Sequence, residues 1–337
     1  MIRFADTAVE EDKFDLSSIV DFIFKEGGWL ENALDFEHRP EQHEMAKSTA
    51  HALLNESHLL FEAGTGVGKS LAYLVPSVLF SCTRKRPCVV ATNTISLQEQ
   101  LLNKDIPALR SLMESNPALE SFKDFRCALL VGRANYLCTT RLHRALSGQG
   151  ELFEGRQRRE LERIAEWANK GAIEGIRQEL SPLPMGAVWD AVSADSSLCS
   201  SKRCKPENCF YRRARAEVEE SDLVIVNHSL LFSLMGAGFG PNDDKGGVMF
   251  ANDFVIFDEA HEMHNSDKDN KVVPPQLEKV LKYASNLRLI FLSATPIYDK
   301  PQNIVSMINY FLINDKKKIM KENEIFDNFG KLKNKGK

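Results

Sequence analysis

The fold of this chain is decided by residues 61–70, Phe61-Glu62-Ala63-Gly64-Thr65-Gly66-Val67-Gly68-Lys69-Ser70. An apolar run at 59–61 precedes the glycines, and an apolar helical pattern at 71–75 follows them. This order of strand, glycine-rich loop and helix is the context that a phosphate-binding loop requires. The glycines let the backbone bend so that successive N–H groups point at one anion. The N-terminus of the following helix adds a positive end.

The residue types in this loop predict separate roles at a nucleotide. Lys69 is expected to reach the β- and γ-phosphates, and the Ser70 hydroxyl to hold Mg²⁺. Ala63 stands where the strict pattern has a glycine. The alternative interpretation is a glycine-rich turn that precedes Lys-Ser by chance. The predicted nucleotide-binding residues of the loop are Ala63, Gly64, Thr65, Gly66, Val67, Gly68, Lys69 and Ser70.

A second motif, Phe254-Val255-Ile256-Phe257-Asp258-Glu259-Ala260-His261, places two carboxylates after a buried strand. In open α/β sheets, ligands bind at the carboxyl ends of the strands. Asp258 is expected to bind Mg²⁺, directly or through water, and Glu259 to orient and deprotonate the attacking water. An isolated Asp-Glu pair after a strand is usually a solvated turn, but the phosphate loop upstream favours a catalytic role.

A third motif, Leu289-Ile290-Phe291-Leu292-Ser293-Ala294-Thr295-Pro296, again reads as a strand followed by small hydroxyl residues. The order of phosphate loop, Asp-Glu-Ala-His and Ser-Ala-Thr resembles the first motor domain of superfamily 2 helicases. The resemblance implies an ATP hydrolase in which Ser-Ala-Thr links the ATP state to the grip on nucleic acid. It also implies that Gln42, with Arg39 one turn before it, contacts the nucleotide base. The alternative is that both are solvated residues at a helix start.

Length and composition set the outer limits. The chain has 337 residues, enough for about two domains, and 43% of them are hydrophobic, as in ordinary globular proteins. The net charge of −4 gives no indication of nucleic-acid binding, so a basic footprint must be local. No apolar run approaches a membrane span, and the N-terminus lacks the build of a signal peptide. We therefore expect a cytoplasmic protein without membrane contact, whose seven cysteines serve metal binding or burial.

Four of the cysteines are grouped: Cys138 stands before a polar insert, and Cys199, Cys204 and Cys209 follow it at equal intervals. Such a group suits tetrathiolate binding. The spacing differs from common zinc ribbons and resembles the iron–sulfur domain of the XPD/DinG helicases, which implies a [4Fe–4S] cluster. Zinc, or no metal at all, remains as an alternative. The other three, Cys82, Cys88 and Cys127, lie on apolar stretches and are predicted to be small core residues.

A local basic patch flanks the last three cysteines. Phe210 and Tyr211 lie among the basic residues, and this mixture suits single-strand binding by phosphate neutralisation and base stacking. The alternative is a solvated charged face. The patch consists of Lys202, Arg203, Lys205, Arg212, Arg213 and Arg215.

From about residue 265 the composition shifts toward Lys and Asn. The DinG-like resemblance covers roughly residues 30–264, whereas 287–301 and 325–332 look more like the Swi/Snf-like helicases of large DNA viruses. We therefore expect a truncated or mosaic chain without a second motor domain. Its predicted parts are a helical lead-in at 1–36, a motor domain at 37–135 and 215–315, an iron–sulfur insert at 136–214, and a basic disordered tail at 316–337.

The sequence thus predicts an α/β fold of the RecA-like P-loop NTPase type, with a mostly parallel sheet and a small helical insert. By resemblance, the parent activity is ATP-driven DNA unwinding with 5′–3′ polarity. The predicted ligands are ATP, Mg²⁺ and a [4Fe–4S] cluster, and the partner is single-stranded DNA or a junction, bound by a monomer. Two alternatives stay open: a binding module for ATP and single strands that does not unwind, and a zinc-stabilised ATPase that does not act on nucleic acid.

Overall fold

The computed structural model describes residues 15–148, 153–199, 204–237, 254–264, 273–283, 287–295 and 303–327, together with Lys331 and Lys333. A six-stranded sheet forms its centre, with the strand order β1-β6-β5-β2-β4-β3. Every neighbouring pair of strands is parallel, which confirms the predicted sheet. The strands are β1 (Leu59–Glu62), β2 (Cys88–Thr92), β3 (Cys127–Leu129), β4 (Leu223–Asn227), β5 (Phe254–Phe257) and β6 (Arg288–Ser293).

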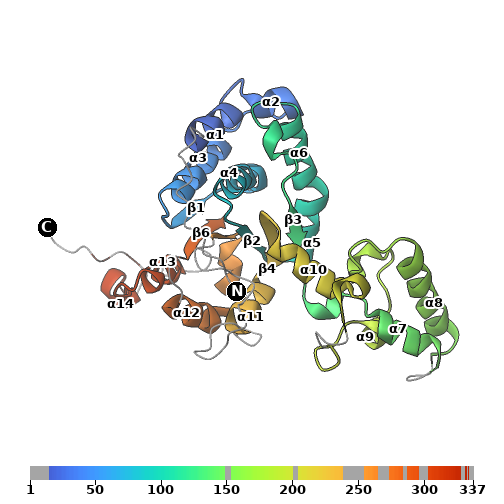
Figure 1. Ribbon diagram of the computed structural model, residues 1–337. Helices are drawn as coiled ribbons and strands as arrows, with labels where there is room; N and C mark the ends of the chain where they lie inside the picture. The colour runs from blue at the N-terminus through green and yellow to red at the C-terminus, as the bar shows by residue number, and fades with distance from the viewer. Residues whose placement is uncertain are drawn as a thin grey trace.

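The central strands are apolar on both faces because helices cover both sides of the sheet, as parallel sheets require. Every residue of β2 and of β5 is buried. Figure 1 shows one group of helices on one side of the sheet and a second group on the other. The first group comprises α1 (Leu16–Phe24), α2 (Trp29–Leu34), α3 (Pro40–Leu54), α4 (Lys69–Arg84) and α6 (Ile106–Glu114).

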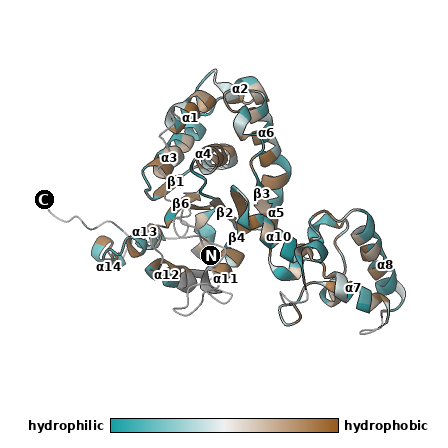
Figure 2. Cartoon of the chain, in the orientation of Figure 1, coloured by the Kyte–Doolittle hydropathy of each residue, from teal (hydrophilic) through white to brown (hydrophobic). Residues whose placement is uncertain are grey.

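Helix α4 is the most deeply enclosed element of this face. All its residues from Leu71 to Ser81 are buried, and Figure 2 colours it mostly as hydrophobic. It packs against α3. A short helix, α5 (Ile95–Gln100), follows β2 and runs through a π-helical segment, Leu101–Asp105, into α6. The P-loop therefore opens a helix that the core holds rigidly.

The opposite face carries α11 (His228–Ala237), α12 (Val273–Tyr283) and α13 (Asn303–Asn314). A short 3₁₀ helix, Ala260–His264, follows β5, and α14 (Glu322–Ile325) lies near the end of the described chain. Residues 316–327, which the sequence assigns to a disordered tail, contain this helix, and Phe326 is buried. Of the four lysines beyond 327, Lys331 and Lys333 are described, and Lys335 and Lys337 lie outside the described part.

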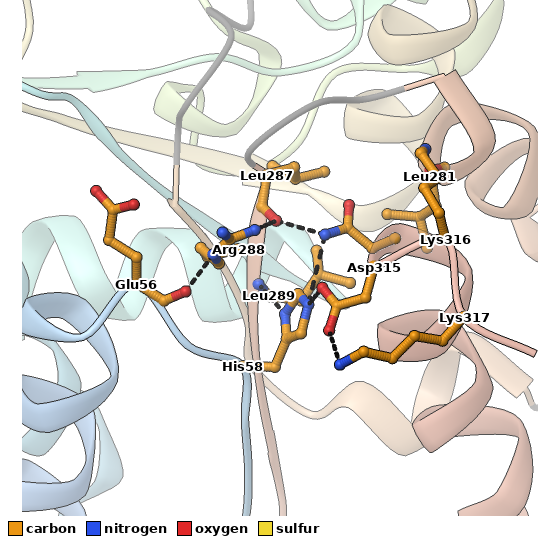
Figure 3. A network of polar contacts seen from close by, with 10 residues as sticks. Glu56, His58, Leu281, Leu287, Arg288, Leu289, Asp315, Lys316 and Lys317 are labelled. Atoms are coloured by element: carbon orange, nitrogen blue, oxygen red, sulfur yellow. Dashed lines mark hydrogen bonds and ion pairs between the residues drawn. The ribbon is translucent and has the colours of Figure 1, made fainter.

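A polar network at the amino ends of β1 and β6 joins the two halves of the sequence (Figure 3). The backbone N–H of Leu289 donates to His58 Nδ1 at 3.1 Å, and His58 Nε2 lies 3.1 Å from Asp315 Oδ1. The His58 ring also stacks on Phe311 with 4.7 Å between ring centroids. Because Nδ1 accepts a hydrogen bond, the neutral ring must donate from Nε2 to Asp315. Strand β6 is thus an integral part of the core, whatever branch its sequence resembles.

The insert between β3 and β4 forms a separate lobe (Figure 1). Its helices are α7 (Thr139–Leu146), α8 (Gly155–Lys170) and α9 (Gly186–Val192), and α10 (Phe210–Glu219) returns the chain to β4. Contrary to what its polar composition suggests, the lobe has a hydrophobic cluster of its own. The buried members are Leu137, Leu142, Leu161, Ile164, Leu180, Val188, Trp189 and Val192.

Within the described residues, no helix is both long enough and apolar enough to cross a membrane. The expected lead-in is present in part: α1 buries Leu16, Val20, Ile23 and Phe24 against the core, as its apolar face predicts. Residues 1–14 lie outside the described part of the chain.

Candidate active site

The glycine-rich loop connects β1 to α4 at the carboxyl edge of the sheet. Gly66 and Gly68 have φ angles of +81° and +86°, a conformation that residues with a Cβ rarely adopt. A Cβ on Gly68 would also lie 2.3 Å from Gln42 Nε2. The backbone turn requires glycine at both positions. At Gly68, the close approach of Gln42 also leaves little room for a side chain. Ala63 is buried at the start of the loop, where its small side chain is accommodated.

Arg39 and Gln42 both contact the loop. Gln42, at the start of α3, is 5% exposed and donates from Nε2 to the Gly68 carbonyl at 2.9 Å. The Arg39 guanidinium donates to the Gly66 carbonyl. Gln42 is thus buried against the loop, whereas Arg39 is exposed but still bonded to it, and both residues brace the loop from the side of α3. Their predicted contact with a nucleotide base stays a prediction.

Lys69 and Glu259 meet directly across the edge of the sheet. Lys69 Nζ lies 2.8 Å from Glu259 Oε1, and the two side chains are 12% and 23% exposed. Their positions in the sequence are 190 residues apart, and the parallel sheet brings them together because β1 and β5 both end at this edge. The two predicted catalytic residues therefore share one site.

Asp258 lies beside this pair and is 7% exposed. Its Oδ2 accepts a hydrogen bond from the Tyr73 hydroxyl at 3.2 Å, whereas its Oδ1 is buried without a partner among the described residues. Burial, and secondarily the negative charge of Glu259, raises the pKa of Asp258 to about 6. A buried carboxylate oxygen without a partner is costly, and a cation at this position would remove that cost.

Glu259 and the residues after it connect this site to the Ser-Ala-Thr strand. Glu259 adopts a φ of +54°, an uncommon conformation for a residue with a side chain. His261 Nδ1 lies 2.8 Å from the hydroxyl oxygen of Ser293, which also accepts a hydrogen bond from the backbone of Thr295. The end of β5 is therefore tied to the end of β6.

Two further residues of the site have no signature in the sequence motifs. Tyr73 lies one turn after Ser70 on α4 and is fully buried, and Asp105, at the end of the π-helical segment, is 9% exposed. The Tyr73 hydroxyl donates to Asp258 Oδ2 at 3.2 Å, and Asp105 Oδ2 is buried without a partner among the described residues. Burial raises the pKa of Tyr73 well above its usual value, so its hydroxyl stays protonated. Only the tertiary structure brings these groups together.

The oxygens at this edge fit a magnesium ion. Mg²⁺ prefers oxygen ligands and is usually held by one or two protein groups besides phosphates. Ser70 offers a hydroxyl, and Asp258 offers the carboxylate oxygen that lacks a partner among the described residues. These are the two residues that the sequence predicts for Mg²⁺.

The four grouped cysteines are all free and half-buried, and Cys138, Cys199 and Cys209 pack against the main hydrophobic core. Burial raises the pKa of Cys209 and of Cys199, and the charge of Arg133 opposes this shift at Cys199. Four thiols are the donor type of an iron–sulfur cluster. The described residues contain no group of three or more ligands close enough to hold a metal, so this structure does not gather the thiols at one centre.

The other cysteines are packing residues, as predicted. Cys88 is fully buried in the sheet, and Cys82 and Cys127 pack against the core. Burial raises the pKa of both half-buried thiols to about 12, so neither is a reactive thiolate.

The basic patch differs from its prediction in part. Arg213 donates to the Ile173 carbonyl and lies over the Phe210 ring, 5.0 Å from its centroid. Arg215 is hydrogen-bonded to Tyr211, which is only 8% exposed and contacts Tyr136. The prediction that Tyr211 stacks on bases is therefore wrong in this conformation. Lys205 is exposed and Arg212 half-buried, while Lys202 and Arg203 lie outside the described residues.

Comparison with known proteins agrees with this geometry. Residues 199–304 match the family model for the DEAD/DEAH box helicase. The chain is 35% identical over 260 residues to the ATP-dependent helicase DinG of Mycobacterium tuberculosis, covering 73% of this chain and 37% of that protein. It is 32% identical over 246 residues to the ATP-dependent DNA helicase YoaA of Haemophilus influenzae, covering 72% and 36% respectively. This chain thus spans little more than a third of the length of these relatives.

Among solved structures, an XPD helicase aligns with 67% of this chain and 33% of its own length, at 17% identity and a TM-score of 0.34. That likeness is too weak to add to the sequence relationship. The order of the three motifs, the parallel sheet that carries them and the relatives agree with one another. The chain belongs to the DinG-like DEAD/DEAH-box helicases of superfamily 2.

Proposed function

We propose that this chain is the ATP-hydrolysing motor part of a DinG-type DNA helicase. One observation carries the proposal: Lys69 Nζ and Glu259 Oε1 lie 2.8 Å apart at the carboxyl edge of the sheet, with Asp258 beside them. A phosphate-binding lysine, a carboxylate suited to the metal and a carboxylate suited to water are the minimum set for hydrolysis of a nucleoside triphosphate.

The ion pair indicates how nucleotide binding prepares the site. Without nucleotide, Lys69 neutralises Glu259. When phosphates enter the loop, they compete for Lys69, because a multiply charged anion attracts an ammonium group more strongly than one carboxylate does. Glu259 is then released to accept a proton from the attacking water. The ion pair thus keeps the base occupied until the substrate arrives.

Ser70 and Asp258 are the residues that would hold Mg²⁺, which neutralises charge on the phosphates when bound. Because the pKa of Asp258 is raised to about 6, most of this carboxyl is ionised at neutral pH and is ready for a cation. Gln42 and Arg39 brace the loop and are candidates for contacting the base.

We propose further that Cys138, Cys199, Cys204 and Cys209 ligate a [4Fe–4S] cluster, as DinG-like resemblance implies. The support is that all four residues are free cysteines, and that Cys138, Cys199 and Cys209 pack against the same hydrophobic core. Thiolate ligation of such a cluster would draw the segment 195–209 against Cys138 and fix the lobe to the motor core. The cluster is thus assigned a structural role near the DNA, and zinc remains the competing metal.

The DNA substrate follows from the names of the relatives: single-stranded DNA or a single-strand junction, unwound 5′–3′ by resemblance. Lys205 and Arg212, with Lys202 and Arg203, are the basic residues proposed for phosphate contact. A DNA helicase of this kind acts in the cytoplasm, and the chain is expected to work as a monomer.

The test is steady-state ATP hydrolysis by the purified chain, with and without single-stranded DNA. Glu259→Gln should lower the turnover rate by roughly 10²–10⁴-fold, since an amide cannot accept the proton from water. Glu166→Gln, on the exposed face of α8, is the matched control and should behave as wild type. If wild type hydrolyses no ATP above background under either condition, or if Glu259→Gln hydrolyses it as fast, the assignment of an ATPase site is refuted.

A further inference from the structure

The Tyr73 hydroxyl occupies a particular place: it contacts Asp258, one of the two residues proposed to hold Mg²⁺. It donates to Asp258 Oδ2 at 3.2 Å. The Tyr73 side chain has no exposed surface, because α4 buries this turn against the sheet. A phenol group in such a place needs a partner for its O–H, and Asp258 supplies it.

The direction of this hydrogen bond follows from the donors available. An ionised carboxylate only accepts, so the Tyr73 O–H must donate to Asp258. Tyr73 lies one turn after Ser70 on α4, so the same helix carries the phenol and the other residue proposed to hold Mg²⁺.

This donation engages Oδ2 and leaves Oδ1 as the oxygen without a partner in the described part of the chain. The phenol group thus fixes which oxygen of the Asp258 carboxylate is available to a cation. Groups that orient metal ligands in this manner commonly change metal affinity by roughly 10–100-fold when removed.

We propose that Tyr73 is a positioning residue for the magnesium site, which holds the Asp258 carboxylate in the geometry that binds the metal. This inference rests on the proposed function, since it assumes that Ser70 and Asp258 bind Mg²⁺ with a nucleotide. The competing explanation is that Tyr73 only fills space in the core. Tyr73→Phe separates the two, because it removes the hydroxyl and keeps the packed ring.

The experiment measures binding of a fluorescent methylanthraniloyl-ATP to the intact chain, first in EDTA and then as MgCl₂ is titrated. Tyr73→Phe should raise the Mg²⁺ concentration for half-maximal enhancement of binding by about 10-fold, and leave the affinity in EDTA unchanged. Tyr310→Phe is the matched control, because Tyr310 is a buried tyrosine on α13, and it should match wild type in both conditions.

Two results would overturn the inference. One is an unchanged Mg²⁺ requirement in Tyr73→Phe, and the other is an equal loss of affinity in EDTA and in Mg²⁺, as a packing defect would cause. Failure of the proposed function looks different: wild type itself would then bind no nucleotide, or would bind it without any response to Mg²⁺.

Discussion

The carboxyl edge of the sheet and the cysteine lobe are both candidate ligand sites, yet they differ in how complete they are without a ligand. At the sheet edge, Lys69 and Glu259 are already 2.8 Å apart. Among the described residues of the lobe, the four thiols form no group close enough to hold a metal. The difference follows from what carries each residue. Fixed strand ends and one buried helix carry the first set, whereas Cys199 and Cys204 lie outside any helix or strand.

Replacement of a ligand-binding residue should therefore affect the two sites unequally. Wild type purified without oxygen should be brown and hold about four irons per chain. Cys204→Ser should abolish this iron binding. Because the lobe has its own hydrophobic cluster, new protease cleavage should be confined to about residues 195–210. Iron analysis and limited proteolysis test this prediction. The nucleotide affinity of Cys204→Ser should equal that of wild type.

Cys127→Ser is the matched control, since Cys127 is packed against the core and should change neither colour nor iron content. A colourless wild type with one zinc, or a Cys204 variant with full iron, would show that the lobe is not an iron–sulfur site.

A smaller effect should distinguish the two regions in DNA binding. Replacing Lys205 and Arg212 with Gln should reduce the slope of log K against log salt by about 0.7 for each phosphate that the protein no longer neutralises. Lys170→Gln, exposed on α8, should leave the slope unaltered. Arg213 is excluded from the set because it contacts the Ile173 carbonyl. Fluorescence anisotropy with labelled single-stranded DNA over a salt series makes the measurement, and an identical slope would assign these residues to a solvated face.

The sheet edge should also show a response to pH. His228 is buried and lies 3.1 Å from the Ala91 carbonyl, and burial lowers its pKa to about 4. The unfolded chain takes up this proton near pH 6.5 and the folded chain does not. Stability is therefore lost as pH falls through that window, by about 2 kcal/mol between pH 7 and 5 at 1.36 kcal/mol per unit.

His228→Gln should lack this loss of stability on acidification. The raised pKa of Asp258 changes stability with pH in the opposite direction, but this contribution is common to both proteins. Urea unfolding at the two pH values gives the difference. Equal pH dependence in the two proteins would mean that His228 is protonated in the folded state.

The sequence predicted the motifs and the sheet because their information is local. A phosphate loop needs glycines at fixed spacing, and a buried strand needs a run of apolar residues. The contact between Tyr73 and Asp258 could not be predicted, since nothing near Tyr73 in the sequence indicates that it meets a side chain 185 residues away.

The lobe was misjudged for a related reason. Its buried residues, from Leu137 to Val192, are spread thinly over a polar segment, so composition hides a core that only folding assembles. Tyr211 shows the same limit. Basic neighbours favoured a base-stacking role, but Arg133 and Arg215 engage its hydroxyl, and the ring is buried.

If the sheet edge is a nucleotide site assembled before its ligand arrives, calorimetric titration of Mg²⁺–ATP into wild type and Lys69→Ala should show it. Wild type should bind the nucleotide. Lys69→Ala should lose most of the affinity, because the phosphates lose their ammonium partner, while its thermal stability should stay close to that of wild type. Equal affinity in the two proteins would contradict the assignment of Lys69, and with it the phosphate loop on which the site is built.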